Sequence, residues 1–295
     1  MSEALAVAET TPVNILQIGI RATQPRAWKL LSASIVINAL IFTTPASSFD
    51  FSTHTNNNQY NATKRIAAIK SGGFDFNIPD GFVSDISRRW GFADGIHLHA
   101  LWPGLEPRHE GNEADFRTPG GGRKVVIAVR FFRHPERRHM FLTRLVFDPE
   151  ERKRIIQYPS DFSNRIHAEQ IFGLNAAFID IRKVAEFLAM YEGQSSSSLE
   201  GTGLLRWLDL FYRTDHNNTV ITLIQCSTRE LVDPPEDTIT GKTVVPVPGC
   251  SHEFVIDEIN ASVSLSYRRK LLPEWQMIES GVRHALLSFR ADVAK

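Results

Sequence analysis

Features that would mark a specialised class of protein are scarce in this sequence. Two cysteines among 295 residues are too few for a small disulfide-dense protein. Lys and Arg total 33 and Asp and Glu total 33, and no stretch carries the clustered positive charge that drives binding to a nucleic-acid backbone. The 42% hydrophobic content, with 18 Gly and 15 Pro, excludes a disordered tail, a collagen-like fibre and a multi-span membrane protein. An ordinary folded protein without a nucleic-acid partner is expected.

Signature motifs of the common enzyme classes are also missing. Gly241-Lys-Thr243 has the end of a phosphate-binding loop, but Glu236 stands where that loop requires Gly, and the prolines that follow prevent a helix. The serines at 195–198 lack the glycine frame of a nucleophile elbow. We therefore assign no catalytic residue and no cofactor, and the sequence favours a non-enzymatic role.

The N-terminal region has the pattern of an export segment. Arg21, Arg26 and Lys29 precede an apolar run at residues 30–42, and small residues follow it. This run of 13 residues is shorter than the ~20 that a spanning helix needs, so residues 1–46 fit a cleaved signal peptide better than a spanning helix. An uncleaved anchor and a buried core helix stay open as alternatives. We expect the protein in the periplasm, or at the inner membrane facing the periplasm.

Beyond this leader, composition divides the chain into a tether and two lobes. Residues 47–63 are polar and lack hydrophobic periodicity, as expected of a tether between a membrane and a folded domain. The tract at 194–198 contains four consecutive serines. Because such tracts lie in surface loops, we place a boundary there, between an N-terminal lobe at 64–193 and a C-terminal lobe at 199–295.

The two cysteines, Cys226 and Cys250, flank strand-like runs. Export to an oxidising compartment favours a disulfide between them, and a bridge that closes a loop of about 24 residues would stabilise the fold by ~3 kcal/mol on the chain-entropy model. Two reduced core thiols, or a metal site that adds His252, are the alternatives. Zinc prefers four ligands, and the sequence offers no clear fourth.

Alternation of apolar and polar residues predicts three antiparallel hairpins. These hairpins join residues 124–132 to 140–147, residues 207–214 to 219–226, and residues 252–257 to 261–268. Residues 73–78 predict a further strand that ends in the turn at 79–81.

Two segments have helical spacing instead. Residues 181–191 place apolar side chains on one face, and Gly193 supplies a stop signal. The second helix begins near Pro273 and places Trp275 and later apolar residues at i, i+3, i+4 and i+7. Its polar face is expected to carry Glu274, Glu279, Arg283 and Arg290. Strands joined by short turns, with few helices of crossover length, predict an α+β fold of mostly antiparallel sheets with a few covering helices, in two lobes.

One pair of histidines is the best metal candidate. His97 and His99 share one face of an extended strand, and two imidazoles so placed are a recurrent metal-binding arrangement. Strand alternation alone also produces this pattern, so we assign no metal and keep the pair as a weak candidate.

Aromatic and arginine residues in loop-like contexts are the candidates for binding a partner, because Trp, Tyr and Arg dominate protein interfaces. The alternative is that the aromatics belong to the core. The weak candidates for binding are Arg89, Trp90, Trp102, Tyr267 and Arg268.

The C-terminal region has a family resemblance that these patterns do not reveal. Pro248-Gly-Cys-Ser-His252, the run at 263–275 and Leu286-Leu-Ser-Phe289 resemble the tail of envelope-anchored proteins that accompany bacterial type VI secretion effectors, some of them immunity proteins. The resemblance covers about 40 residues of the chain. It implies a compartment and a protein-binding role, and it transfers no functional residue.

Together, these features predict an exported, envelope-associated module that binds another protein, most plausibly as an immunity protein that neutralises an antibacterial toxin. The inner membrane is a second partner if the N-terminal segment is uncleaved. A metal-assisted envelope hydrolase centred on His97 and His99 is the alternative, and a structural envelope component is a third hypothesis.

Overall fold

The structure of the protein is a computed structural model. It describes residues 69–71, 73–85, 87, 95–118, 121–134, 136, 138–147, 158–193, 199–235, 239 and 246–291. All of these residues belong to the second of two compact units, which spans residues 58–295. The expected leader and tether, and the serine tract at 194–198, lie outside the described residues.

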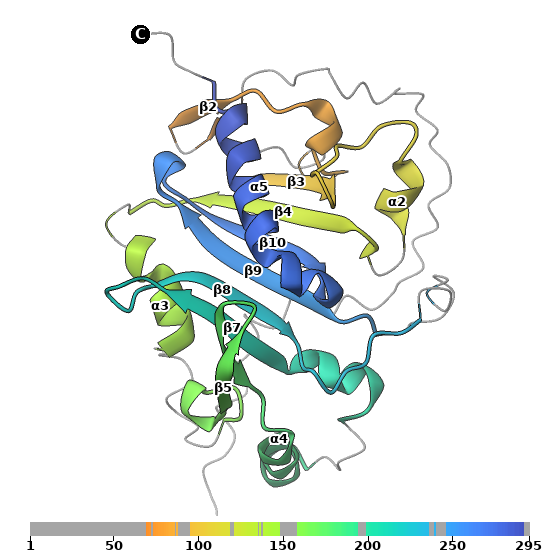
Figure 1. Cartoon of the computed structure of the whole chain (residues 1–295), viewed down its shortest axis with the longest axis vertical. Coiled ribbons are helices and arrows are strands. Elements are labelled where there is room, and N and C mark those ends of the chain that lie inside the picture. The colour runs from red at the N-terminus through yellow and green to blue at the C-terminus, as the bar shows by residue number, and fades with distance from the viewer. Residues whose placement is uncertain are drawn as a thin grey trace, which may run out of the picture. The chain divides into compact units, whose positions relative to one another are not determined.

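An antiparallel sheet of eight strands forms the centre of this unit (Figure 1). The strands follow the order β3-β4-β10-β9-β8-β7-β6-β5, and each pairs antiparallel with its neighbours. Their bounds are Ile96–Leu101 (β3), Lys124–Phe131 (β4), Ile166–Ile171 (β5), Leu174–Phe178 (β6), Leu208–Thr214 (β7), Val220–Ser227 (β8), Gly249–Ile256 (β9) and Ala261–Arg268 (β10). A separate two-stranded sheet pairs β1 (Ile69–Ser71) with β2 (Phe74–Phe76).

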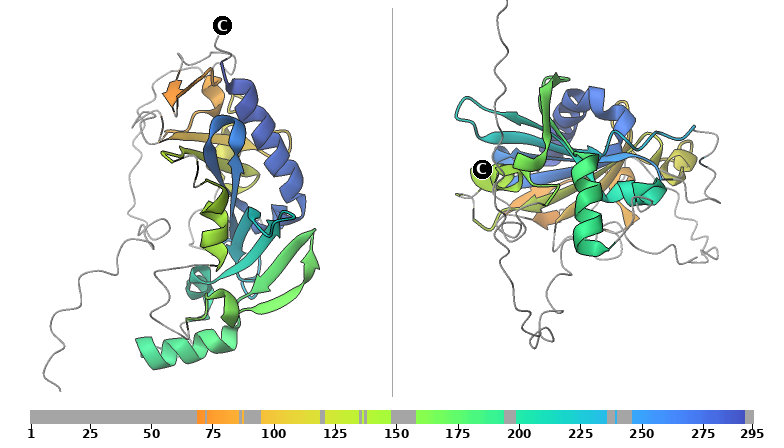
Figure 2. Two further views of the ribbon diagram at one scale, coloured as in Figure 1. Left: turned by 90° about the vertical axis from the view of Figure 1, so that its left-hand side faces the viewer. Right: turned by 90° about the horizontal axis from the view of Figure 1, so that it is seen from below.

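Helices cover both faces of the large sheet (Figure 2). The α-helices are α2 (Glu113–Arg117), α3 (Arg138–Phe147), α4 (Ile181–Phe187) and α5 (Trp275–Phe289). On one face, α5 packs over the main core, to which Phe254 of β9 belongs. On the other, α3 packs over a second cluster, against which Val255 of β9 lies. Because adjacent strand residues point to opposite faces, this alternation separates the two cores. The predicted α+β class is confirmed.

The C-terminal helix matches its prediction closely. Trp275, Ile278, Val282 and Leu286 of α5 are all buried, as the i, i+3, i+4, i+7 spacing requires. Pro273 lies in the 3-10 turn Arg269–Glu274 that precedes the helix, where its missing N–H costs little.

Two of the three predicted hairpins are present. β7 pairs with β8, and β9 pairs with β10 in continuous register from Gly249↔Arg268 to Ile256↔Ala261. Asn218 and Asn260 adopt positive φ in the two connections, a conformation that Asn tolerates better than most residues. The helix expected at 181–191 is also present, continues as a π-helix over Leu188–Glu192, and ends at Gly193 with φ 61°.

The prediction of a strand over residues 140–147 is wrong. This segment belongs to α3, so β4 has no hairpin partner there and pairs instead with β3 and β10. Leu142 and Val146 of α3 are 1% and 4% exposed, whereas Leu145 is 48% exposed. The i, i+4 spacing of the two buried side chains is that of a helix face, and it lets them pack on the second core.

The expected division into two lobes also differs from the structure. Strands from 64–193 and from 199–295 join one sheet, in which β4 lies beside β10 and β6 beside β7. Long-range pairing therefore unites the two halves of the chain. Within the described part, no helix combines the length and the hydrophobicity that crossing a membrane requires.

The expected disulfide is present between β8 and β9. Cys226 and Cys250 are directly opposed in the ladder, with their Cα atoms 4.0 Å apart, and their sulfur atoms are bonded. Both residues are buried on the α5 side of the sheet. Reduced thiols and a metal site with His252 are thereby excluded for this state of the protein.

Candidate functional site

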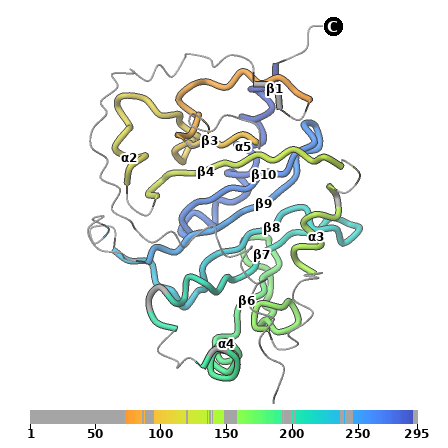
Figure 3. The backbone as a smooth tube through the Cα atoms, turned by 180° about the vertical axis from the view of Figure 1, so that it is seen from behind, coloured from red at the N-terminus to blue at the C-terminus, as the bar shows by residue number. Residues whose placement is uncertain are grey.

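β3 places the two candidate histidines on the face of the sheet opposite α5, which Figure 3 shows from behind. His97 and His99 are half-buried and alternate with the buried Ile96 and Leu98. Burial lowers the pKa of both rings, to about 4 for His99, and the charges of nearby cationic groups add to the effect. Both imidazoles are therefore neutral at pH 7.

The surroundings of this pair do not complete a metal site. Among the residues that the structure describes, no group of three His, Cys, Asp or Glu side chains could hold a metal ion. Glu106 and His109, which follow in the sequence, pair with each other at 2.8 Å. The sequence thus predicted the shared face correctly, but β3 brings no third ligand to it.

A buried polar cluster lies under α5, on the other face. Glu279 Oε2 accepts hydrogen bonds from Thr222 Oγ1 at 3.0 Å and from His252 Nε2 at 3.0 Å. With its proton on Nε2, His252 accepts from the hydroxyl of Tyr267 through Nδ1 at 3.2 Å. All four residues are at most 8% exposed. Burial lowers the pKa of His252 against the opposing effect of Glu279, and it raises the pKa of Tyr267.

This cluster connects the helix to three strands. Glu279 belongs to α5, Thr222 to β8, His252 to β9 and Tyr267 to β10. The order tyrosine–imidazole–carboxylate has the form of a proton relay, but the hydroxyl at its end is buried with a raised pKa. The arrangement therefore fixes α5 on the sheet by satisfied hydrogen bonds, as buried polar groups require.

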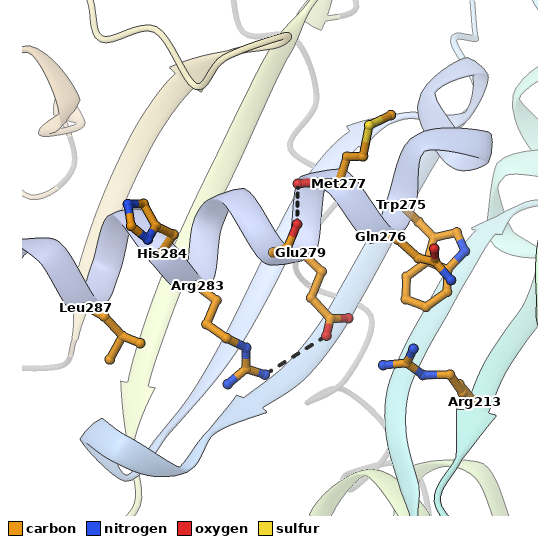
Figure 4. Close-up of a pocket in the computed structure, with 9 residues that line it drawn as sticks. Arg213, Trp275, Gln276, Met277, Glu279, Arg283, His284 and Leu287 are labelled. Atoms are coloured by element: carbon orange, nitrogen blue, oxygen red, sulfur yellow. Dashed lines mark hydrogen bonds and ion pairs between the residues drawn. The ribbon is translucent and has the colours of Figure 1, made fainter.

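Beside the cluster lie two surface hollows, and Figure 4 shows the larger one, which follows α5. They measure about 650 and 380 Å³, the larger being within the usual range for ligand pockets. Arg213, Glu279 and Arg283 line both of them. We call these two connected hollows the α5 groove.

The three residues shared by the hollows differ in their partners. Arg283 donates to the carbonyl of Val255 at 2.9 Å, and it forms ion pairs with Glu258 at 3.7 Å and Glu279 at 4.0 Å. Arg213 instead stacks over the ring of Trp275, 5.0 Å from its centre. Its Nε is buried, and within the described residues it makes no hydrogen bond.

The residues proposed from sequence as partner contacts lie elsewhere. Trp102 is 8% exposed and donates from Nε1 to Glu274 at 2.7 Å. Tyr267 and Arg268 are each 4% exposed, so the alternative that these residues belong to the core describes them better. Arg89 and Trp90 lie outside the described residues.

Sequence reasoning missed the α5 groove because it assigned Glu279 to the polar face of the helix. Glu279 is in fact 8% exposed. A signal was present in the strands, since alternation places Arg213 on the same face as the buried Phe211, and Thr222 on the same face as the buried Ile224. Polar side chains at core-facing positions mark either a buried network or a site.

Comparison with known proteins finds a likeness in fold to one solved structure. No family model matches the chain, and no curated protein matches its sequence. The chain is similar in structure to Smlt3025, an immunity protein of the Stenotrophomonas maltophilia type IV secretion system, with a TM-score of 0.56. The two are 21% identical, and the match covers 77% of this chain and 94% of that one. At this identity the likeness shows a common fold.

This match changes the scope of the resemblance seen in the sequence. The likeness in fold covers 77% of this chain, well beyond the C-terminal 40 residues that carry the resemblance in the sequence. The solved protein is named for a type IV secretion system, so it gives no support to a specific association with type VI secretion.

Proposed function

We propose that this chain is an immunity protein that binds and neutralises an antibacterial toxin in the bacterial envelope. The observation that carries the proposal is the fold match, which accounts for 94% of the length of a secretion-system immunity protein. An immunity protein needs an exposed surface that fits its toxin rather than catalytic groups, and we propose the α5 groove as that surface.

The proposed location rests on two features. The bond between Cys226 and Cys250 is of a kind that persists in oxidising compartments such as the periplasm. The apolar run at residues 30–42, preceded by cations, fits an export segment. We therefore place the toxin-binding unit on the periplasmic side of the inner membrane.

Toxin neutralisation can be tested in two stages. Tagged full-length protein is isolated from the envelope of its native cells after mild crosslinking, and mass spectrometry identifies a stoichiometric partner. That partner is then directed to the periplasm of a sensitive strain, with and without this chain. Restored growth that depends on this chain supports the proposal. Unchanged toxicity despite a stable complex, or the absence of any stoichiometric partner, contradicts it.

The hydrolase alternative gains no support from the geometry. It requires His97 and His99 to hold a metal ion, and the described residues supply two neutral imidazoles without a third ligand. We therefore advance no second function.

A further inference from the structure

We propose that the α5 groove binds an acidic side chain of the partner protein, and that Arg213 is the residue that receives its carboxylate. This inference rests on the proposed function, because it names the surface and the chemistry by which a toxin would be held. It concerns a site that neither the fold match nor the sequence assigns.

The first observation is that Arg213 lacks an acidic partner. Within the described residues, the other two arginines of the groove have one: Arg138 donates to Asp257 at 2.7 Å, and Arg283 pairs with Glu258 and Glu279. Among these described residues, Arg213 has no ion pair, and its buried Nε makes no hydrogen bond. A carboxylate that enters the groove would therefore give Arg213 the acidic partner that the other two arginines already have, through charge-assisted hydrogen bonds to its guanidinium.

The second observation is that the guanidinium is held in place before any ligand arrives. Its central carbon lies over the ring of Trp275, and the indole N–H of Trp275 donates to the carbonyl of Phe172 at 2.9 Å. The hydrogen bond to the hairpin between β5 and β6 fixes the edge of the indole, and Arg213 lies over one face. A guanidinium held over an aromatic ring can still form two parallel N–H bonds to one carboxylate. Preorganisation of this kind reduces the entropic cost of binding.

The surroundings select the kind of anion. The larger hollow has a mixed lining, in which the apolar Met277, 56% exposed, and Leu287 lie among polar residues such as Gln276 and Ser280. The smaller hollow adds Asp215 and Asp257, whose negative charges oppose a polyanion such as a phosphate-rich ligand. A single Asp or Glu side chain of a protein meets this opposition with one charge, and the mixed lining can contact the residues around it.

The chemistry of the groove can be tested without knowledge of the toxin. Full-length protein labelled with ¹⁵N-arginine is titrated with N-acetyl-aspartate N-methylamide, and the neutral N-acetyl-asparagine N-methylamide serves as the matched probe. We expect the Nε–Hε signal of Arg213, assigned from its loss in Arg213→Lys, to shift in a saturable manner at millimolar concentration with the aspartate probe only. Equal shifts with both probes, or no shift with either, would overturn the inference.

The toxin provides the second arm of the test. The partner identified by crosslinking is bound to wild type, to Arg213→Gln and to Arg117→Gln. Arg117 is 77% exposed in its side chain and pairs with Glu113 on α2, which makes it a control for loss of one surface charge. Loss of a central arginine contact is expected to weaken binding ~10- to 100-fold, and Arg117→Gln is expected to have no such effect.

The two proposals fail in different ways. A toxin that binds wild type and Arg213→Gln equally would overturn the role of Arg213 and leave the proposed function standing. The absence of a toxin partner would contradict the proposed function, while the aspartate titration would still decide the chemistry of the groove. If Arg213→Gln does not fold, Arg213→Lys is used instead. The lysine keeps the charge and loses the paired N–H geometry. Unchanged toxin affinity in Arg213→Lys would count against the inference.

Discussion

Acidification should destabilise the protein through His99, and the structure fixes the sign and the size of the effect. The folded-state pKa of His99 is lowered from 6.5 to about 4, first by burial and then by the charges of Lys124 and Arg108, with Asp85 acting in the opposite direction. Below pH 6.5 the unfolded chain therefore binds a proton that the folded chain does not. Stability is lost as pH falls from about 6.5 to about 4, and no further loss from this group occurs below that window.

The magnitude follows from the gap between the two pKa values. Each pKa unit corresponds to ~1.4 kcal/mol, and most of the gap is realised between pH 7 and pH 4.5. The loss from His99 over this interval is about 2 kcal/mol, and solvent reaching the half-buried ring makes this an upper value.

Urea unfolding at pH 7.0 and pH 4.5 measures this effect when wild type is compared with His99→Gln. The glutamine keeps a polar side chain on β3 but does not titrate, so the pH-dependent loss should be up to about 2 kcal/mol smaller in the variant. Burial raises the pKa values of Asp209 and Glu253, so these two carboxyls make the fold more stable as pH falls. Both are present in wild type and in His99→Gln, so their effects cancel in the comparison. His216→Gln, in the exposed connection between β7 and β8, is the control. Equal pH dependence in wild type and His99→Gln would refute the buried environment of this ring.

Three further predictions test the core and the buried cluster. Thiol titration of unfolded, unreduced protein should detect essentially no free thiol, and two titratable thiols would contradict both the bridge and the oxidising location. Cys226→Ala/Cys250→Ala should lower the free energy of unfolding by ~3 kcal/mol, because the loop of 24 residues is no longer closed in the unfolded state. Leu142→Ala should lower the free energy of unfolding in urea by about 2–4 kcal/mol. Leu145→Ala, on the same helix but 48% exposed, should lower it by less than ~1 kcal/mol. Equal losses in the two variants would argue against the helical orientation of α3. Glu279→Ala should destabilise the protein by about 2–4 kcal/mol, because His252 and Thr222 lose their acceptor. A double-mutant cycle with His252→Ala should give a coupling energy of ~1 kcal/mol or more. Strict additivity of the two substitutions would show that the hydrogen bond between Glu279 and His252 contributes little.

The parts of the fold that the sequence predicted are those with one dominant periodicity. The strand pair of β9 and β10 alternates without interruption around Asn260, and α5 repeats apolar residues at helical spacing. Segment 140–147 is apolar at six of its eight positions, so neither period stands out. There the packing of Leu142 and Val146 on the second core decides for a helix, and that core is assembled from distant strands that local sequence does not reveal.

The candidate site was harder to predict than the fold for a related reason. His97 and His99 are conspicuous because they are two imidazoles two residues apart, yet the described residues around them supply no third metal ligand. Arg213 is inconspicuous in the sequence, since a single arginine in an alternating strand is ordinary. Its significance arises from Trp275, which lies 62 positions later in the chain and meets it through the packing of α5 on the sheet.

The buried cluster and the α5 groove share Glu279, and this links the position of the helix to the properties of the surface. One oxygen of that carboxylate joins Thr222 and His252 inside the protein, while the other faces Arg283 in the groove. A rotation or a one-residue slip of α5 would take the carboxylate away from its buried donors and leave them unsatisfied, so the cluster favours one register of the helix over its neighbours. The same register places Trp275 against Arg213 and the carbonyl of Phe172. The interior hydrogen bonds therefore help to place Trp275 against Arg213 of β7, and the surface proposed to receive a carboxylate depends on the packing of the helix on the sheet.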